Sequence, residues 1–133
     1  MRGNIRANRA FRLFRNDFAE YFETYIYVPN HVYALDTSRT DEVYCLASKK
    51  SKAIVGVYST SYAIVIGPKH NSVPIGMMGR VEVATDGFIP KGSLVGLSET
   101  QLGKASLHTD GYILGIATQD TKDGLTRILI GGY

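Results

Sequence analysis

The nine residues KAIVGVYST, at positions 52–60, form an apolar run with a glycine at its centre. The β-branched and aromatic residues of this run favour a β-strand. Gly56 is unusual inside such a strand, because glycine weakens a strand interior and has no side chain to pack. Gly56 therefore predicts either a β-bulge or the close approach of another backbone at a corner of the sheet.

The pattern around this strand occurs twice in the chain. In both copies an apolar strand is followed by a polar turn, a short strand and an Ile-x-Gly-Val/Ile strand. Two such units, joined by VPIGMMGRVEV (73–83), can pair into one closed or nearly closed sheet, which removes exposed strand edges. The copies are HVYALDTSRTDEVYCLASKKSKAIVGVYST (31–60) and SLVGLSETQLGKASLHTDGYILGIATQ (93–119), which align Leu35 with Leu97, Leu46 with Leu107 and Gly56 with Gly115.

The rest of the body, from about Thr24 onward, has the same β character. Short runs rich in Val, Ile, Tyr and Leu alternate with turn residues. Three Asp-Gly pairs begin at Asp86, Asp110 and Asp123, and they supply the positive φ that tight hairpins need. The expected fold is mainly β, a small barrel or sandwich with internal duplication.

Composition narrows the possible functions. The 133 residues are enough for one domain with its own core, residues 17–133, and no apolar run approaches the roughly 18 residues that span a membrane. The single cysteine, Cys45, cannot form an internal disulfide. The three histidines lie far apart, none with a second ligand at metal spacing, so neither a metal site nor a cofactor is expected.

Charge separates the first 16 residues from the body. They contain five arginines and no acid, a charge of +5, whereas the remaining residues hold ten basic and twelve acidic side chains, a charge of −2. Such an arm favours an acidic partner, to which aromatic residues can anchor and guanidinium groups can pair with carboxylates. A dedicated nucleic-acid domain is not expected on an acidic body. The predicted partner-binding residues are Arg2, Arg6, Arg9, Phe11, Arg12, Phe14 and Arg15.

A short helix is predicted between the arm and the β domain, from Asn16 to about Glu23. Asp17 and Glu20 have the spacing of a capping box, and acids in a first turn suit the helix dipole. This interpretation leaves Glu23 unexplained.

The stretch DFAEYFE (17–23) also resembles the D-Y-A-E-Y-F-E start of the autoproteolytic chaperone domain of bacteriophage neck-appendage proteins. KAIVGVYS and PIGMMGRVEV resemble two strands of that family in the same order, so the resemblance covers about residues 16–97. It implies self-cleavage at the Asn16–Asp17 bond, with Asp17, Glu20 and Glu23 at the acidic positions. One such carboxylate would act as general base or nucleophile and a second as acid.

This sequence departs from the family at several positions. Thr24 stands where the family has tryptophan, the acid-rich stretch after the motif is missing, and only 16 residues precede the expected cut. The closing stretch, with its repeated glycines and short strands, is similar to small β-barrel proteins of phage heads and tail fibres. We therefore expect a phage-type virion structural protein rather than an enzyme.

The expected protein is a capsid decoration or cement protein, a homotrimer in the virion that binds the major capsid protein or another virion protein. Its arm anchors it, and buried aromatic side chains supply most of the binding energy. The alternatives are an autoproteolytic assembly-chaperone domain, a tail-fibre or baseplate module, and an arm-driven nucleic-acid binder.

Overall fold

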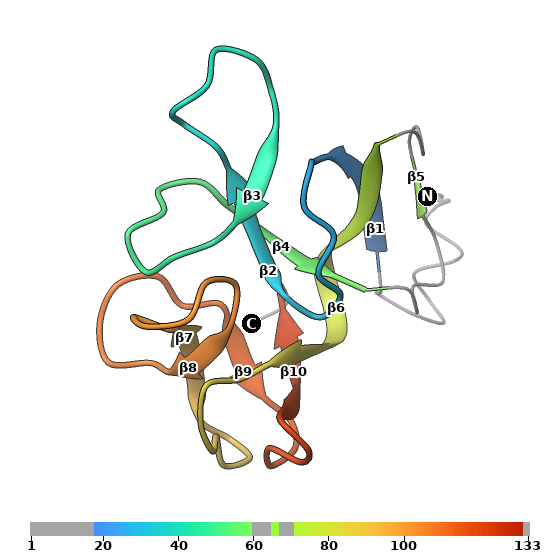
Figure 1. Ribbon diagram of the computed structural model, residues 1–133. Helices are drawn as coiled ribbons and strands as arrows, with labels where there is room; N and C mark the ends of the chain where they lie inside the picture. The colour runs from blue at the N-terminus through green and yellow to red at the C-terminus, as the bar shows by residue number, and fades with distance from the viewer. Residues whose placement is uncertain (1–17, 60–64, 67–70, 132–133) are drawn as a thin grey trace.

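The strands form one curled, mainly antiparallel sheet with the shape of a half-barrel (Figure 1). The computed structural model describes residues 18–59, 65–66 and 71–131, and within these ranges it contains strands and turns but no helix. These ranges therefore hold no candidate for a membrane-spanning helix. The strands are β1 (Phe18–Glu23), β2 (Val32–Leu35), β3 (Tyr44–Leu46), β4 (Ile54–Tyr58), β5 (Val65–Ile66), β6 (Ser72–Ala84), β7 (Leu94–Leu97), β8 (Ala105–Leu107), β9 (Gly115–Ala117) and β10 (Leu125–Ile130).

The expectation of a mainly β fold is confirmed, but the predicted helix at residues 16–23 is wrong over its described part. Phe18–Glu23 form strand β1, which pairs antiparallel with β6 and, through Ala19 and Glu20, parallel with β5. A capping pattern contributes only about 1 kcal/mol. A full ladder with β6 and the complete burial of Ala19 outweigh that local signal. The basic arm at residues 1–16 lies outside the described ranges.

Two units with the same strand pairing make up the sheet. The first contains β1 to β4 and the first half of β6, and the second contains the second half of β6 and β7 to β10. Gly79, with φ of 104°, divides β6 between them. β2 pairs with β3 and β4 as β7 pairs with β8 and β9. The register reproduces the predicted correspondences, because Tyr33 faces Leu46 and Gly56, whereas Val95 faces Leu107 and Gly115.

The structural repeat is longer than the sequence alone indicated. Strand β1 corresponds to the second half of β6, since Glu23 faces Ser72 where Ala84 faces Leu125. The residues that follow these strands form equivalent parallel bridges, Thr24 with Tyr44 and Thr85 with Ala105. The repeat therefore includes β1 and both halves of β6, which the 31–60 and 93–119 alignment omitted.

Both glycines of the Ile-x-Gly strands lie against another backbone. A Cβ atom on Gly56 would lie 1.9 Å from the carbonyl oxygen of Gly76, and one on Gly115 would lie 2.4 Å from that of Leu129. The β2–β4 register also shifts between Tyr33 and Ala34, next to Gly56. The predicted close approach is therefore confirmed in both units.

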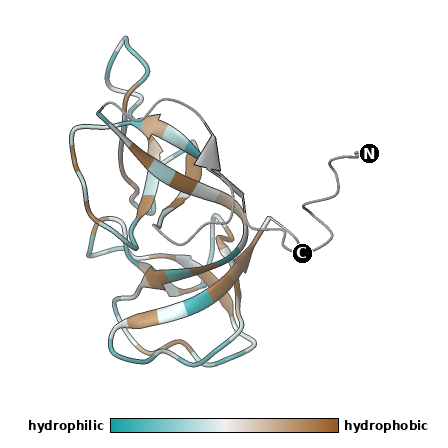
Figure 2. Cartoon of the chain, turned by 90° about the vertical axis from the view of Figure 1, so that its right-hand side faces the viewer, coloured by the Kyte–Doolittle hydropathy of each residue, from teal (hydrophilic) through white to brown (hydrophobic). Residues whose placement is uncertain are grey.

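Apolar and polar residues alternate along the strands (Figure 2), and the apolar faces form two cores. The small core belongs to the first unit and centres on Tyr33, Val73 and Ile75. The main core combines both units: Val32, Ala34, Ala47 and Val57 from the first, and Val81, Val83, Ile89, Val95, Leu97, Ala105, Leu114, Ala117, Ile128 and Ile130 from β6 onward.

Backbone hydrogen bonds join the two units at the edge of this main core. Gly103, in the turn between β7 and β8, accepts a hydrogen bond from Val32 N–H at 2.7 Å and donates one to the Ala47 carbonyl at 2.7 Å. The Ala84 N–H donates to the Asn30 carbonyl at 2.8 Å. The second unit thus binds the start of β2 and the residue after β3, both of which belong to the first unit.

Two of the three Asp-Gly pairs supply the predicted positive φ. Asp123 and Gly124 have φ of 54° and 76°, and Lys122 and Leu125 on either side form a two-residue hairpin. Gly111 has φ of 79°. The prediction is wrong for Asp86-Gly87, where neither residue has positive φ.

Candidate functional site

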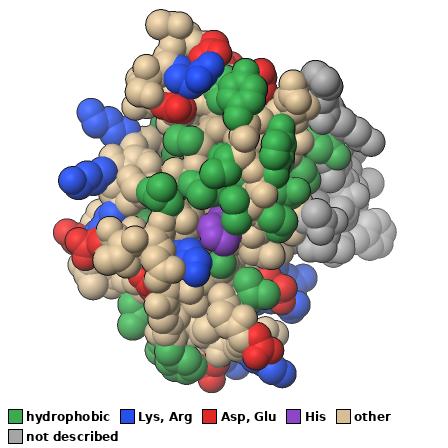
Figure 3. All heavy atoms as spheres, in the orientation of Figure 1, with side chains coloured by type: hydrophobic (Ala, Val, Ile, Leu, Met, Phe, Trp, Pro, Cys, Tyr) green, Lys and Arg blue, Asp and Glu red, His purple; other side chains and the backbone are tan. Residues whose placement is uncertain are grey.

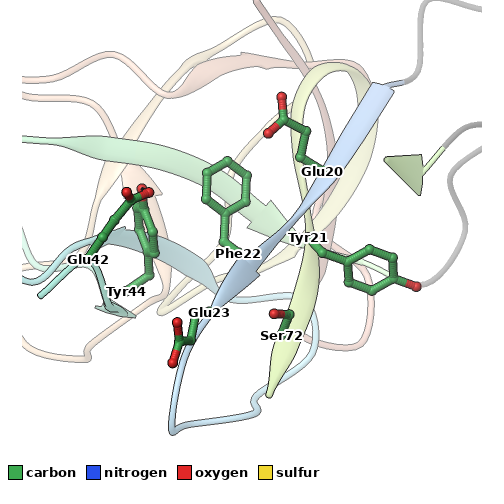
Figure 4. A pocket seen from close by; sticks show the side chains of 7 residues that line it. All are labelled: Glu20, Tyr21, Phe22, Glu23, Glu42, Tyr44 and Ser72. Atoms are coloured by element: carbon green, nitrogen blue, oxygen red, sulfur yellow. Dashed lines mark hydrogen bonds between the residues drawn. The ribbon is translucent and has the colours of Figure 1, made fainter. Parts of the chain in front are cut away.

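An open pocket of about 310 Å³ lies between β1 and the β3 hairpin (Figure 4). Alternation along β1 directs Glu20 and Phe22 to one side of the strand and Tyr21 to the other (Figure 4). No lysine or arginine lines the pocket among the described residues, so its acids give it a negative charge. It is lined by Glu20, Tyr21, Phe22, Glu23, Glu42, Tyr44 and Ser72.

The aromatic wall of the pocket is ordered by two contacts. The rings of Phe22 and Tyr44 meet edge to face, with centroids 4.9 Å apart and planes at 75°. The Tyr44 hydroxyl donates a hydrogen bond to Glu42 Oε2 at 2.7 Å. An edge-to-face pair adds about 1 kcal/mol beyond the area that it buries. The wall is thus rigid and apolar at its centre and acidic at its rim.

Burial, the hydrogen bond to Glu42 and the charges of Glu42 and Glu20 raise the pKa of Tyr44 to about 12. Because the folded-state pKa exceeds the usual value near 10, the neutral phenol stabilises the folded state fully below pH 10. That contribution is lost as the pH rises toward 12.

We expect the stability difference between the wild type and Tyr44→Phe to shrink between pH 9 and pH 11.5. Urea unfolding at a series of pH values measures it, and Tyr27→Phe, at an exposed tyrosine, is the control. A difference that stays constant over this range would show that Tyr44 titrates as an ordinary tyrosine.

A short apolar loop, residues 24–29, lies directly after β1. Tyr25 is 62% exposed, Tyr27 is 51% exposed, and Ile26 between them is also exposed. The loop runs across the face shown in Figures 1 and 3, where hydrophobic side chains gather. Consecutive exposed apolar side chains of this kind are typical of a protein-binding surface.

Buried groups fix the backbone of this loop. The buried Tyr33 hydroxyl donates a hydrogen bond to the Ile26 carbonyl at 2.6 Å and accepts one from the Val28 N–H at 3.0 Å. The Thr24 hydroxyl donates to the Tyr44 carbonyl at 2.8 Å. Burial raises the pKa of Tyr33, so its hydroxyl stays a donor. The loop therefore presents its apolar side chains in one preorganised arrangement.

A cation lies over the first aromatic ring of the loop. The Arg39 guanidinium carbon is 5.4 Å from the centroid of the Tyr25 ring, and Arg39 Nε and Nη2 bind both carboxylate oxygens of Asp41 at 2.8 and 2.9 Å. These contacts are exposed and contribute little to stability.

The structure brings together only part of the acidic trio predicted from sequence. Glu20 and Glu23 line the same pocket, and Figure 4 shows Phe22 between them. Asp17 and the Asn16–Asp17 bond lie outside the described residues, as do all the predicted partner-binding residues of the arm: Arg2, Arg6, Arg9, Phe11, Arg12, Phe14 and Arg15.

Sequence reasoning missed Glu42 and Tyr44. They reach the pocket because the residue after β1, Thr24, bridges to Tyr44 across 20 positions of sequence. The Glu-x-Tyr spacing, which places both side chains on one face of a strand, was the only local signal.

Among the described residues, no three His, Cys, Asp or Glu side chains gather in a way that could hold a metal ion. His31 and His108 each have a ring nitrogen 3.0 Å from a nearby carbonyl oxygen, that of Pro29 and of Gly111 respectively. Cys45 lies half-buried in β3, and burial raises the pKa of its thiol. A raised pKa disfavours the reactive thiolate.

The acidic pocket and the apolar loop both belong to the first unit, where the loop follows β1 directly in the chain, and each is a candidate binding surface. Comparisons of the chain with protein-family models, with curated proteins and with solved structures found no match.

Proposed function

We propose that this protein is a phage-type virion structural protein, a capsid decoration or cement protein that binds through its basic arm and its apolar loop. The rigid, exposed loop at residues 24–29 is the observation that carries the proposal. A preorganised aromatic surface binds a partner at low entropic cost, which suits a protein that braces neighbouring subunits.

The arm and the loop would act together, because the arm leads directly into β1 and the loop follows it. The five arginines favour an acidic partner surface, and the tyrosines of the loop supply apolar contact. The partner in this proposal is the major capsid protein or another virion protein, and the decoration protein is a homotrimer. A tail-fibre or baseplate module would use the same two features.

Replacing Arg6, Arg9 and Arg12 with glutamine should weaken binding to purified particles of the virus that encodes the protein by roughly tenfold or more. Co-sedimentation at several protein concentrations measures the affinity. The matched control replaces the exposed body lysines Lys50, Lys52 and Lys122, which removes the same charge. Equal losses in the two variants would mean that general charge attraction accounts for binding, and the proposal would be abandoned.

Self-cleavage is the second candidate, because the acidic motif resembles that of an autoproteolytic chaperone and Glu20 and Glu23 share one pocket. The intact mass of the protein recovered from its assembly separates the two candidates. Loss of residues 1–16 would favour the chaperone, whereas a full-length mass would favour the decoration protein.

A further inference from the structure

The open pocket of the first unit has an equivalent in the second unit, and there it is filled. The register of β1 and β6 and the two parallel bridges define the matching positions. Five of the seven matching positions in the second unit are buried, whereas the pocket of the first unit is open to solvent. The other two, which match Tyr21 and Ser72, are exposed Glu82 and half-buried Leu125. Glu20 matches Val81, Phe22 matches Val83, Glu23 matches Ala84, Glu42 matches Gly103 and Tyr44 matches Ala105.

Residues of the first unit cover the position on the second unit that is equivalent to the pocket. Ala84 and Gly103, which match the pocket residues Glu23 and Glu42, make the backbone hydrogen bonds to Asn30, Val32 and Ala47 described above. The pocket of the first unit is thus the counterpart of the contact between the two units, but no segment covers it among the residues that the structure describes.

The second unit contains a segment equivalent to the one that covers this position, and its own segment is not covered in that way. The residues that match Asn30, Val32 and Ala47 are Gly92, Leu94 and His108. Asn30 and Gly92 both have positive φ, 65° and 91°, which is uncommon for a residue other than glycine. The two segments also share a hydrogen bond: the Ala47 N–H donates to the Val32 carbonyl at 2.8 Å, and the His108 N–H donates to the Leu94 carbonyl at 3.1 Å.

A row of paired residues across the sheet also differs in exposure between the two units. In the first unit Val32, Val57 and Gly76 face one another across three strands, and all are buried. The matching outer row in the second unit is Leu94, Ile116 and Leu129. Leu94 is 45% exposed, and Ile116 and Leu129 are half-buried.

Each chain therefore carries both halves of one contact, an open pocket on the first unit and the outer row on the second. We propose that a second copy of this chain docks its outer row into the pocket, repeating between chains the contact that joins the two units within a chain. The interface is heterologous, so that each copy uses both surfaces and a ring or a chain of copies results.

Charge supports the pairing of these two surfaces. Glu20, Glu23 and Glu42 make the pocket acidic. On the second unit, exposed Lys91 immediately precedes Gly92. By the correspondence between the units, Lys91 approaches Glu23. The complementary charges of this pair favour the heterologous register over contact between two pockets or two rows.

Sedimentation of the full-length chain over a concentration series tests the proposal. We expect concentration-dependent association, weakened about tenfold or more by Leu94→Asp. Leu102→Asp is the matched control, because Leu102 is 61% exposed and lies outside the row and the pocket. Lys91→Glu or Glu23→Lys alone should weaken association about threefold, and the double exchange should restore it. Circular dichroism confirms that each variant is folded.

The proposal would be overturned by a chain that stays monomeric at every concentration, by equal effects of Leu94→Asp and Leu102→Asp, or by no recovery in the double exchange. Association that is lost on replacing the arm arginines but unchanged by Leu94→Asp would also overturn it. That result would indicate that the basic arm, and not the outer row, binds in the pocket.

Discussion

Replacing Gly56 with alanine should destabilise the protein by about 3 kcal/mol or more. The new methyl carbon would lie 1.9 Å from the Gly76 carbonyl oxygen, far inside contact distance. Backbone rather than a flexible side chain blocks it, so β4 and β6 must separate where Val57 pairs with Gly76. The free energy of unfolding in urea measures the loss, and Gly115→Ala should show a similar cost for the same reason.

Gly87→Ala is the matched control for these substitutions. No atom lies within 4 Å of a Cβ built on Gly87, and its φ is not in the left-handed region. Alanine should therefore leave the stability within about 0.5 kcal/mol or increase it slightly. If Gly56→Ala and Gly87→Ala unfolded at the same urea concentration, the close approach of β4 and β6 would be disproved.

Tyr33→Phe should cost about 1–3 kcal/mol although it removes a single oxygen atom. The Tyr33 hydroxyl donates a hydrogen bond to the Ile26 carbonyl and accepts one from the Val28 N–H, and Tyr33 is completely buried. Without the hydroxyl, the Val28 N–H loses this partner, and the Ile26 carbonyl is left with a 3.2 Å contact to the Thr24 hydroxyl. The free energy of unfolding in urea and the rate of limited proteolysis within residues 24–29 measure the effect.

Tyr27→Phe is the control for this substitution, because Tyr27 is on the same loop but exposed. It should change the unfolding free energy by less than about 0.5 kcal/mol. If Tyr33→Phe were equally mild, the loop would be held by its apolar contacts and not by the buried hydroxyl.

Sequence periodicity predicted the parts of this fold that depend on local pattern. The doubled Ile-x-Gly strand fixed the correspondence of Gly56 with Gly115, and the register of both units agrees with it. The Asp123-Gly124 hairpin followed from turn chemistry alone. The positive φ of the Asp123-Gly124 turn is a constraint within a few residues, although the same pair at Asp86-Gly87 does not adopt it. The glycines of the Ile-x-Gly strands instead reflect the close approach of a neighbouring strand.

The features that were missed depend on contacts between distant segments. The sequence of residues 17–23 combines a helix-capping pattern with aromatic residues that suit a strand, and the pairing of Phe18–Glu23 with β6 decides between the two. Glu42 and Tyr44 join the pocket through the bridge from Thr24. The full length of the repeat was hidden because one continuous strand, β6, belongs to both units.

That shared strand also constrains how the chain folds. During synthesis the first unit lacks its last strand until β6 emerges, and β10, the final strand, then pairs with the other half of β6. Neither unit completes its sheet without a segment that is continuous with its neighbour. The two units should therefore fold and unfold in a single cooperative transition rather than as separate foldons.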